Sequence, residues 1–242
     1  MKHVPRLIAL LSFHNEMEFL PGYLCNVAAQ VDGIVALDDG STDGSGDFVA
    51  GHSAVLELVR VAPRVPHIWD ESKYRGGLIA AAAKHEPDWL IGLDADERLE
   101  KDFRARSVTE IERAERDGVL AMSVYIRELW NSPVQYRSDG HWGSKRHARL
   151  FRQREDAEID PKTIHGHWAP LNSKTNGGYP PGDLNVYHLR MIDAARRRAR
   201  RERHELMDPE RRLQPIGYAH LTDETGLELS PLSVGREYEP LP

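Results

Sequence analysis

Two aspartates one residue apart are the side chains of this sequence best suited to binding a metal ion. The apolar run 90–93 is followed by Asp94, Ala95 and Asp96. Residues two apart in a strand point to the same side, so both carboxylates would project from its carboxyl end, where open α/β sheets bind ligands. Such oxygen donors suit Mg²⁺ or Mn²⁺, which also bind water and substrate phosphates. An acidic turn is the structural alternative.

A second acidic loop follows an earlier strand. The chain reads as strand, helix and strand before Asp38 and Asp39. A right-handed βαβ unit would bring this loop to the same sheet edge as the first aspartate pair. An Asx-turn before a helix explains the neighbouring glycines and serine, but explains two adjacent aspartates less well. The expected elements are strands at 6–12 and 33–37 with a helix over 15–30 between them.

Three segments in the first hundred or so residues carry a family resemblance: Ser12-Phe13-His14-Asn15-Glu16, the loop 38–45 and the segment 93–97. In this order and at this spacing they resemble the nucleotide-sugar-dependent glycosyltransferases of family 2. The resemblance implies an α/β fold of the GT-A type, in which a Rossmann-like nucleotide-binding sheet is followed by a C-terminal acceptor-binding subdomain. Residues 149–152, 165–167 and 186–189 resemble the family more loosely.

The resemblance also implies how a donor and a metal would be bound. Asp94 and Asp96 would contact the ribose, the diphosphate and a bound Mn²⁺ or Mg²⁺. Arg75 stands at the start of an alanine-rich helix, where a cation and the helix amino end both favour a pyrophosphate, although a solvated arginine is the alternative. His188 is expected to complete the metal site, with a satisfied core histidine as the alternative. The residues expected around the nucleotide are Phe13, His14, Asn15, Glu16, Asp38, Asp39, Arg75 and Asp94.

Transfer with inversion of the anomeric centre requires a group that takes the acceptor proton. Asp139, beside Gly140 and His141 in the expected cleft, is the first candidate, and Asp160 and His165 are alternatives. A non-catalytic nucleotide-binding scaffold is the rival function, because the acceptor half departs from the commoner patterns. A phosphatase using Asp-x-Asp is less favoured, because the pair here follows two βα units instead of the first strand.

We expect a division of the chain near residue 126. Residues 1–126 would form the nucleotide-sugar-binding half, and residues 127–242 the acceptor-binding half. Aromatic residues and histidines gather between 130 and 182, and aromatic faces pack on sugar rings. The other elements expected are strands at 55–61, 90–94 and 120–126 and helices at 74–85 and 102–116.

A strongly basic helix is expected over 191–206. Met191, Ala195, Ala199 and Leu206 form a narrow apolar stripe that would dock on the body of the protein, leaving six arginines spread around the rest. Solvation is the simple interpretation of these charges. Attraction to an anionic membrane surface or to a phosphorylated lipid acceptor is the functional one.

Composition indicates an enzyme of the cytoplasm. The chain has 242 residues, of which 40% are hydrophobic, and its single cysteine excludes an intramolecular disulfide. No apolar run approaches the roughly 20 residues that span a bilayer, and a net charge of -6 disfavours general nucleic-acid binding. We expect a nucleoside-diphosphate sugar donor, a glycan, lipid-linked or small-molecule acceptor, a role in cell-envelope or glycan biosynthesis, and at most peripheral contact with the inner face of the membrane.

Overall fold

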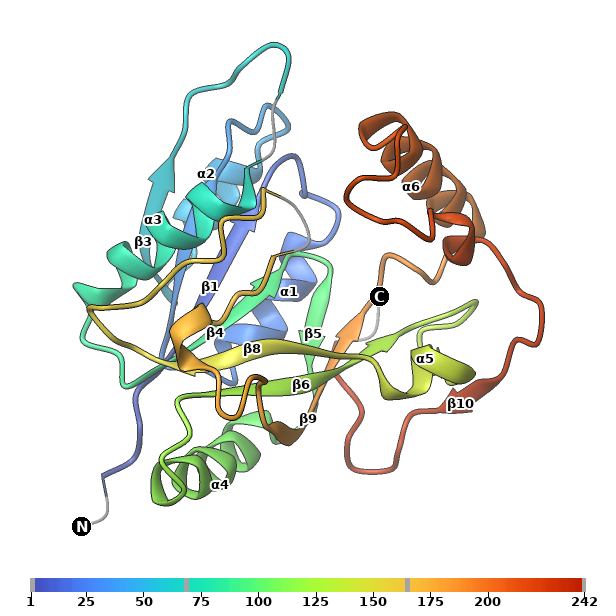
Figure 1. Ribbon diagram of the computed structural model, residues 1–242. Helices are drawn as coiled ribbons and strands as arrows, with labels where there is room; N and C mark the ends of the chain where they lie inside the picture. The colour runs from blue at the N-terminus through green and yellow to red at the C-terminus, as the bar shows by residue number, and fades with distance from the viewer. Residues whose placement is uncertain (1–2, 68–69, 164–165, 241–242) are drawn as a thin grey trace.

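A mixed sheet forms the centre of the molecule (Figure 1). The structure is a computed structural model that describes residues 3–67, 70–163 and 166–240, and within these residues the sheet has eight strands in the order β3-β2-β1-β4-β8-β6-β9-β5. The strands are β1 (Leu7–Phe13), β2 (Gly33–Asp38), β3 (Val55–Arg60), β4 (Trp89–Asp94), β5 (Glu97–Leu99), β6 (Ala121–Glu128), β8 (Arg146–Arg152) and β9 (Pro181–His188). A separate pair joins β7 (Gln135–Arg137) to β10 (Leu229–Pro231).

The first four strands are parallel and nearly all apolar. Every residue of β1 and β2 is buried, as expected of strands that are covered on both faces. Their positions confirm the predicted strands near 6–12, 33–37, 55–61 and 90–94.

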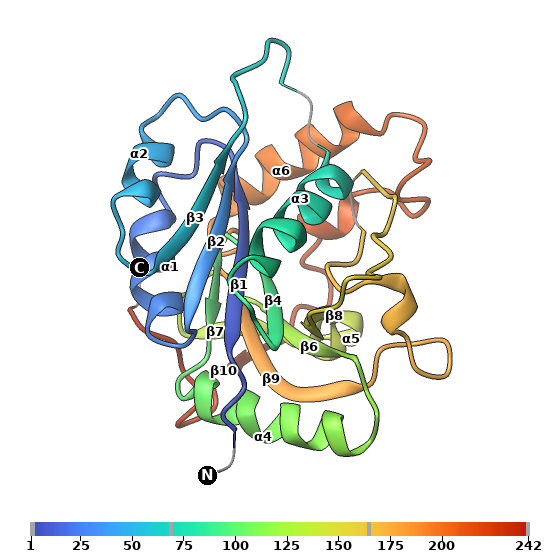
Figure 2. The ribbon, with the colours of Figure 1, turned by 90° about the vertical axis from the view of Figure 1, so that its left-hand side faces the viewer.

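Helices cover both faces of this parallel half (Figure 2). Apolar residues of α1, α2 and α4 pack in one core cluster, whereas those of α3 pack in another with the opposite face of the sheet. The helices are α1 (Leu20–Ala28), α2 (Ser45–Ala50), α3 (Glu71–Ala83), α4 (Phe103–Arg116), α5 (Gly140–Ser144) and α6 (Ala194–Met207), with short 3-10 turns η1 (Leu171–Ser173) and η2 (Ala219–Leu221). In the described parts of the chain, no helix has the length and apolarity required to span a membrane.

The strand register brings the polar loops to one edge. Phe13 of β1 lies beside Asp38 of β2, and Ser12 lies beside Asp94 of β4. The carboxyl ends of these parallel strands therefore meet, which confirms the predicted common edge for the two acidic loops.

The sheet continues across the predicted boundary at residue 126. Strand β8 lies between β4 and β6 and is antiparallel to both, while β9 lies between β6 and β5. Of the four strands on this side of β4, β8 and β9 thus come entirely from residues after 126. The division between residues 1–126 and 127–242 stays a prediction about which half binds which substrate.

The prediction for the basic helix was wrong in its docking face. Of the four residues in the predicted stripe, Met191 is buried, whereas Ala195 and Ala199 are exposed and Leu206 is 82% exposed. Arg197 is buried instead, and it donates to Asn131 and Glu224 at 2.9 Å each. The helix also begins at Ala194, three residues later than expected, because the Asp193 carboxylate accepts the Arg196 N–H as an N-cap.

Candidate functional site

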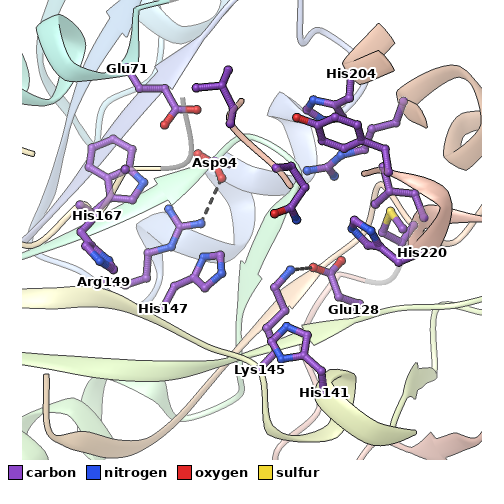
Figure 3. Close-up of a pocket in the computed structure, with 18 of the residues that line it drawn as sticks. Glu71, Asp94, Glu128, His141, Lys145, His147, Arg149, His167, His204 and His220 are labelled. Carbon is purple, nitrogen blue, oxygen red and sulfur yellow. Dashed lines mark hydrogen bonds and ion pairs between the residues drawn. The ribbon is translucent and has the colours of Figure 1, made fainter. Parts of the chain in front are cut away.

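A cleft of about 570 Å³ opens at the carboxyl edge of the parallel strands. Ser12 and Asp94 reach it from β1 and β4, and Arg149 reaches it from β8. Figure 3 shows Glu71, His167 and Arg149 on one side of the cleft and His204 and His220 on the other, with Asp94 between them. The cleft thus joins the parallel strand ends to the C-terminal third of the chain.

Asp94 points into this cleft from the last position of β4. Its side chain is 47% exposed and accepts a hydrogen bond from Arg149 Nη2 at 3.1 Å. Arg149 also contacts Glu97 Oε1 at 2.7 Å, and the Asp94 N–H donates to Glu97 Oε2 at 2.9 Å. Burial raises the pKa of Glu97, although Arg149 opposes the rise. These contacts hold the Asp94 backbone and carboxylate in place while leaving that carboxylate accessible.

Asp96 has different surroundings from Asp94. Strand β4 ends at Asp94, so the two-residue alternation does not extend to Asp96, which is buried. Its Oδ2 lies 3.0 Å from His188 Nε2 and also accepts from Arg190 Nε. Burial works against a charged imidazole, but Glu128 and Asp96 raise the pKa of His188 to about 9.

Arg190 links this buried group to the loop after β1. Its guanidinium contacts Asp96 and donates to Glu16 Oε1 at 2.6 Å. Burial raises the pKa of Glu16, with Arg190 opposing the rise. The structure therefore brings together Glu16, Asp96 and His188, which the sequence places far apart.

Asp96 and His188 carry donor atoms of the kinds that a divalent metal accepts, but in this structure they are bound to each other, and Asp96 is also bound to Arg190. Their closest atoms are 3.0 Å apart, about the separation of neighbouring ligands on an ion with bond lengths of roughly 2.1 Å. Glu128 Oε2 lies 2.5 Å from His188 Nδ1, in the place of a carboxylate that orients a ligating imidazole. The described residues contain no group of three or more potential ligands, and Asp94 is not part of this pair. A bound ion would require neutral His188 and movement of Arg190 away from Asp96.

A second polar cluster surrounds Asp39 at the end of β2. The Asp39 carboxylate is fully buried and accepts from Tyr74 and Arg64 at 2.5 Å each, with His67 at 2.6 Å. The His14 ring stacks on His67 at 3.8 Å, and its Nδ1 lies 2.9 Å from the Asp39 carbonyl oxygen. A ligand of Asp39 would therefore replace donors that the protein already supplies.

The loops after β1 and β2 are bound to each other. The Asp38 carboxylate accepts the Ser41 N–H at 2.8 Å, and the Asn15 side chain accepts the Thr42 N–H at 2.7 Å. Phe13 is buried in the core. Asn15 and Asp38 thus shape this edge of the sheet, whereas Phe13 packs beneath it.

Arg75 holds the loop that follows residue 159. It pairs with Glu71 at 2.8 Å and donates to the carbonyl oxygens of Asp160 and Lys162 at 3.1 and 2.7 Å. A Cβ on Gly166 would lie 2.3 Å from its guanidinium. Arg75 lines the cleft but is itself 2% exposed.

Two of the three candidate bases, Asp139 and Asp160, lie outside the cleft lining. Asp139 is held by Arg137 through two contacts of 2.8 and 3.0 Å, and it precedes α5. Asp160 accepts the backbone N–H groups of Lys162 and His167. Neither aspartate is among the residues that line the cleft, and His165 lies outside the described residues.

Sequence reasoning did not identify the basic residues that face the cleft from β8 and α6. The surrounding protein, and then Arg149 and Lys145, hold the pKa of His147 well below its ordinary value of 6.5. Lys145, His147 and Arg149 alternate in sequence, which would have indicated one face of a strand. Arg200 and His204 carry no comparable signal, because a helix rich in arginine has basic residues on every side.

Comparisons with known proteins agree with this architecture. The family model described as glycosyl transferase family 2 matches residues 9–170. An uncharacterised protein of Mycobacterium tuberculosis is 30% identical over 215 residues, covering 86% of this chain and 52% of the relative. A TPR repeat-containing protein of Synechococcus elongatus is 32% identical over 142 residues, covering 59% of this chain and 30% of the relative. The crystal structure of S. aureus TarS has a TM-score of 0.52 and 11% identity, covering 81% of this chain and 39% of that one.

The parallel strands and the cleft at their carboxyl ends define an α/β protein of the GT-A type, as predicted. The chain belongs to glycosyl transferase family 2, because the family model matches most of its length. It spans about half the length of the Mycobacterium relative that it matches.

Proposed function

We propose that this protein transfers a sugar from a nucleoside-diphosphate sugar to an acceptor hydroxyl. The observation that carries the proposal is the cleft that exposes Asp94 at the end of β4, two residues before Asp96, which is buried against His188 behind the residues that line the cleft. This arrangement lies at the sheet edge where α/β proteins bind nucleotides, in a chain of family 2. Its role in cell-envelope or glycan biosynthesis is part of the same proposal.

The donor would lie along the edge formed by β1, β2 and β4. Asp39 and His14 would contact the nucleoside, and Asp94 the ribose. Asp96 and His188 would hold Mn²⁺ or Mg²⁺, which when bound offsets charge on the departing diphosphate. The other task of the protein is to hold the anomeric carbon against the acceptor oxygen while excluding water.

We propose inversion, with His147 taking the acceptor proton. Figure 3 shows His147 among the cleft residues between Arg149 and Lys145. Its lowered pKa keeps the imidazole neutral and able to accept a proton at pH 7. Asp139 would instead fix the start of α5 through Arg137. Proton NMR of the product tests the stereochemistry, because retained anomeric configuration would contradict this role.

Donor binding can be tested before the acceptor is known. We would measure thermal unfolding with a panel of nucleotide sugars, with and without Mn²⁺. A donor at 100 times its dissociation constant should add about 2.7 kcal/mol to the free energy of unfolding. Asp96→Asn should abolish the Mn²⁺-dependent part of the shift. Exposed Asp102→Asn is the matched control and should keep it.

The outcome of this experiment separates two functions. Turnover of the stabilising donor supports a transferase, whereas binding without turnover in the presence of candidate acceptors would favour a nucleotide-binding scaffold. No stabilisation by any nucleotide sugar would contradict both.

We also propose peripheral contact with an anionic membrane through the outer side of α6. The support is a combination of exposed Arg198 with exposed Leu206 and Met207 on one helix. Basic residues near such a surface contribute roughly 1 kcal/mol each. The protein should sediment with phosphatidylglycerol vesicles and remain in solution with phosphatidylcholine vesicles. Equal sedimentation with both would contradict this proposal.

A further inference from the structure

The cations at the two ends of the cleft differ in their partners. At one end Arg75 pairs with Glu71, and Arg149 pairs with Asp94. At the α6 end, within the part of the chain that the structure describes, Arg200 forms no ion pair, although its charge helps to lower the pKa of Glu128, and its Nε is buried without a hydrogen-bond acceptor. Its guanidinium Nη1 lies 3.4 Å from His188 Nε2, which supplies no negative charge. The α6 end therefore has a positive charge that Glu128 offsets from a distance but that no described carboxylate meets in an ion pair.

Imidazole and aromatic rings surround this charge. His204 follows Arg200 by four residues on α6, so both lie on the same face of the helix. The His204 ring stacks on Tyr218 at 5.0 Å, and the His220 ring lies 5.9 Å from Trp142. All five side chains line the cleft.

The electrostatic surroundings of His220 agree with this excess of positive charge. Burial lowers the pKa of His220, and the positive charges of Lys145 and Arg200 lower it further. The His220 imidazole already has a hydrogen bond with the Gly217 backbone, which favours its protonated form. An anion bound here would therefore receive its hydrogen bonds from the Arg200 guanidinium and lie beside the His220 ring.

We infer that Arg200, His204 and His220 bind an oxyanion, a phosphate or a carboxylate, carried by the acceptor. The inference rests on the proposed transferase function, which places the donor diphosphate and its metal at Asp94, Asp96 and His188, so that Arg200 lies where the donor and acceptor parts of the cleft meet. The acceptor is accordingly an anionic molecule whose charged group lies near α6 and whose hydroxyl lies near His147.

Inorganic phosphate is the first probe, titrated calorimetrically into the full chain. Arg200→Gln should weaken phosphate binding about tenfold or more, since it removes a charge-assisted hydrogen bond. Arg200→Lys should retain part of the affinity. Arg198→Gln removes an exposed arginine from the same helix and should change the affinity less than twofold. Circular dichroism verifies that each variant is folded.

A competition experiment identifies which substrate carries the oxyanion. The titration is repeated with Mn²⁺ and a saturating amount of the nucleoside diphosphate that gives the largest thermal shift. Unchanged phosphate affinity supports an acceptor subsite. Loss of phosphate binding would show that Arg200 contacts the donor diphosphate and would overturn the inference, as would phosphate affinity that is equal in wild type and Arg200→Gln.

Failure of the proposed transferase function can be distinguished from failure of the oxyanion inference. If no nucleoside diphosphate binds, the donor assignment is wrong, whereas the first titration still reports whether Arg200 binds an oxyanion.

Discussion

At the scale of single residues, the proposed inverting transfer depends on a side chain that takes the acceptor proton. His147→Gln should lower turnover by about 100-fold or more, which is the usual contribution of a general base. Because the pKa of His147 lies well below 6.5, the neutral form persists through pH 6.5. Turnover measured as a function of pH should therefore begin to fall on the acid side only below pH 6.5.

The matched variant is Asp139→Asn. It should change turnover much less than His147→Gln and act mainly on stability, because Asp139 contacts Arg137 and not the cleft. If steady-state assays show a larger loss of turnover for Asp139→Asn than for His147→Gln, Asp139 is the base and the assignment of His147 is wrong.

The sequence identified both aspartates of the site but not their different environments. Alternation along a strand holds only while the strand continues, and β4 ends at Asp94. Asp96 therefore turns into the interior, towards His188, which follows it by 92 positions. Spacing within a motif carries no information about where the chain bends after the strand. His188 was chosen from resemblance, and only the pairing of β5 with β9 shows how it reaches Asp96.

At the scale of elements, α6 is attached to the protein by a buried arginine. Arg197 contacts Glu224 and Asn131 and lies 4.1 Å from the centre of the Trp130 ring. Arg197→Ala should lower the free energy of unfolding by about 2 kcal/mol, because it leaves the Met191 carbonyl oxygen, a buried acceptor, without this donor and removes the packing of the arginine on Trp130. Arg198→Ala should change it by less than about 0.5 kcal/mol. Urea unfolding followed by circular dichroism compares the two, and equal effects would contradict this account of docking.

The docking face explains why an apolar pattern was misleading for this helix. Burial of an arginine depends on partners far along the chain, and Glu224 is 27 residues from Arg197. The strands of the parallel half were predictable because strands covered on both faces are apolar throughout. Helix α6 has no such internal signature, since arginine stems can pack against a protein while their charged ends find partners.

At the scale of the whole molecule, the sheet order predicts that residues 1–126, the half proposed to bind the nucleotide sugar, are not an independent folding unit. A fragment of residues 1–126 would lack β8, which pairs with β4 on one side and β6 on the other. We expect this fragment to show no cooperative thermal transition under conditions in which the full chain does. A dispersed amide proton spectrum together with cooperative melting of the fragment would contradict the expectation.

The same strand order affects the protein while it is being synthesised. Strands β1 to β4 leave the ribosome first, but the open side of β4 is covered only by β8, which ends at Arg152. Translation at roughly 5–20 residues per second leaves this edge unpaired for several seconds. Unpaired edges of apolar strands are templates for association with other chains. The nascent protein thus passes through an interval in which chaperone binding, or slow translation that lengthens the interval, would determine how much of it reaches the folded state.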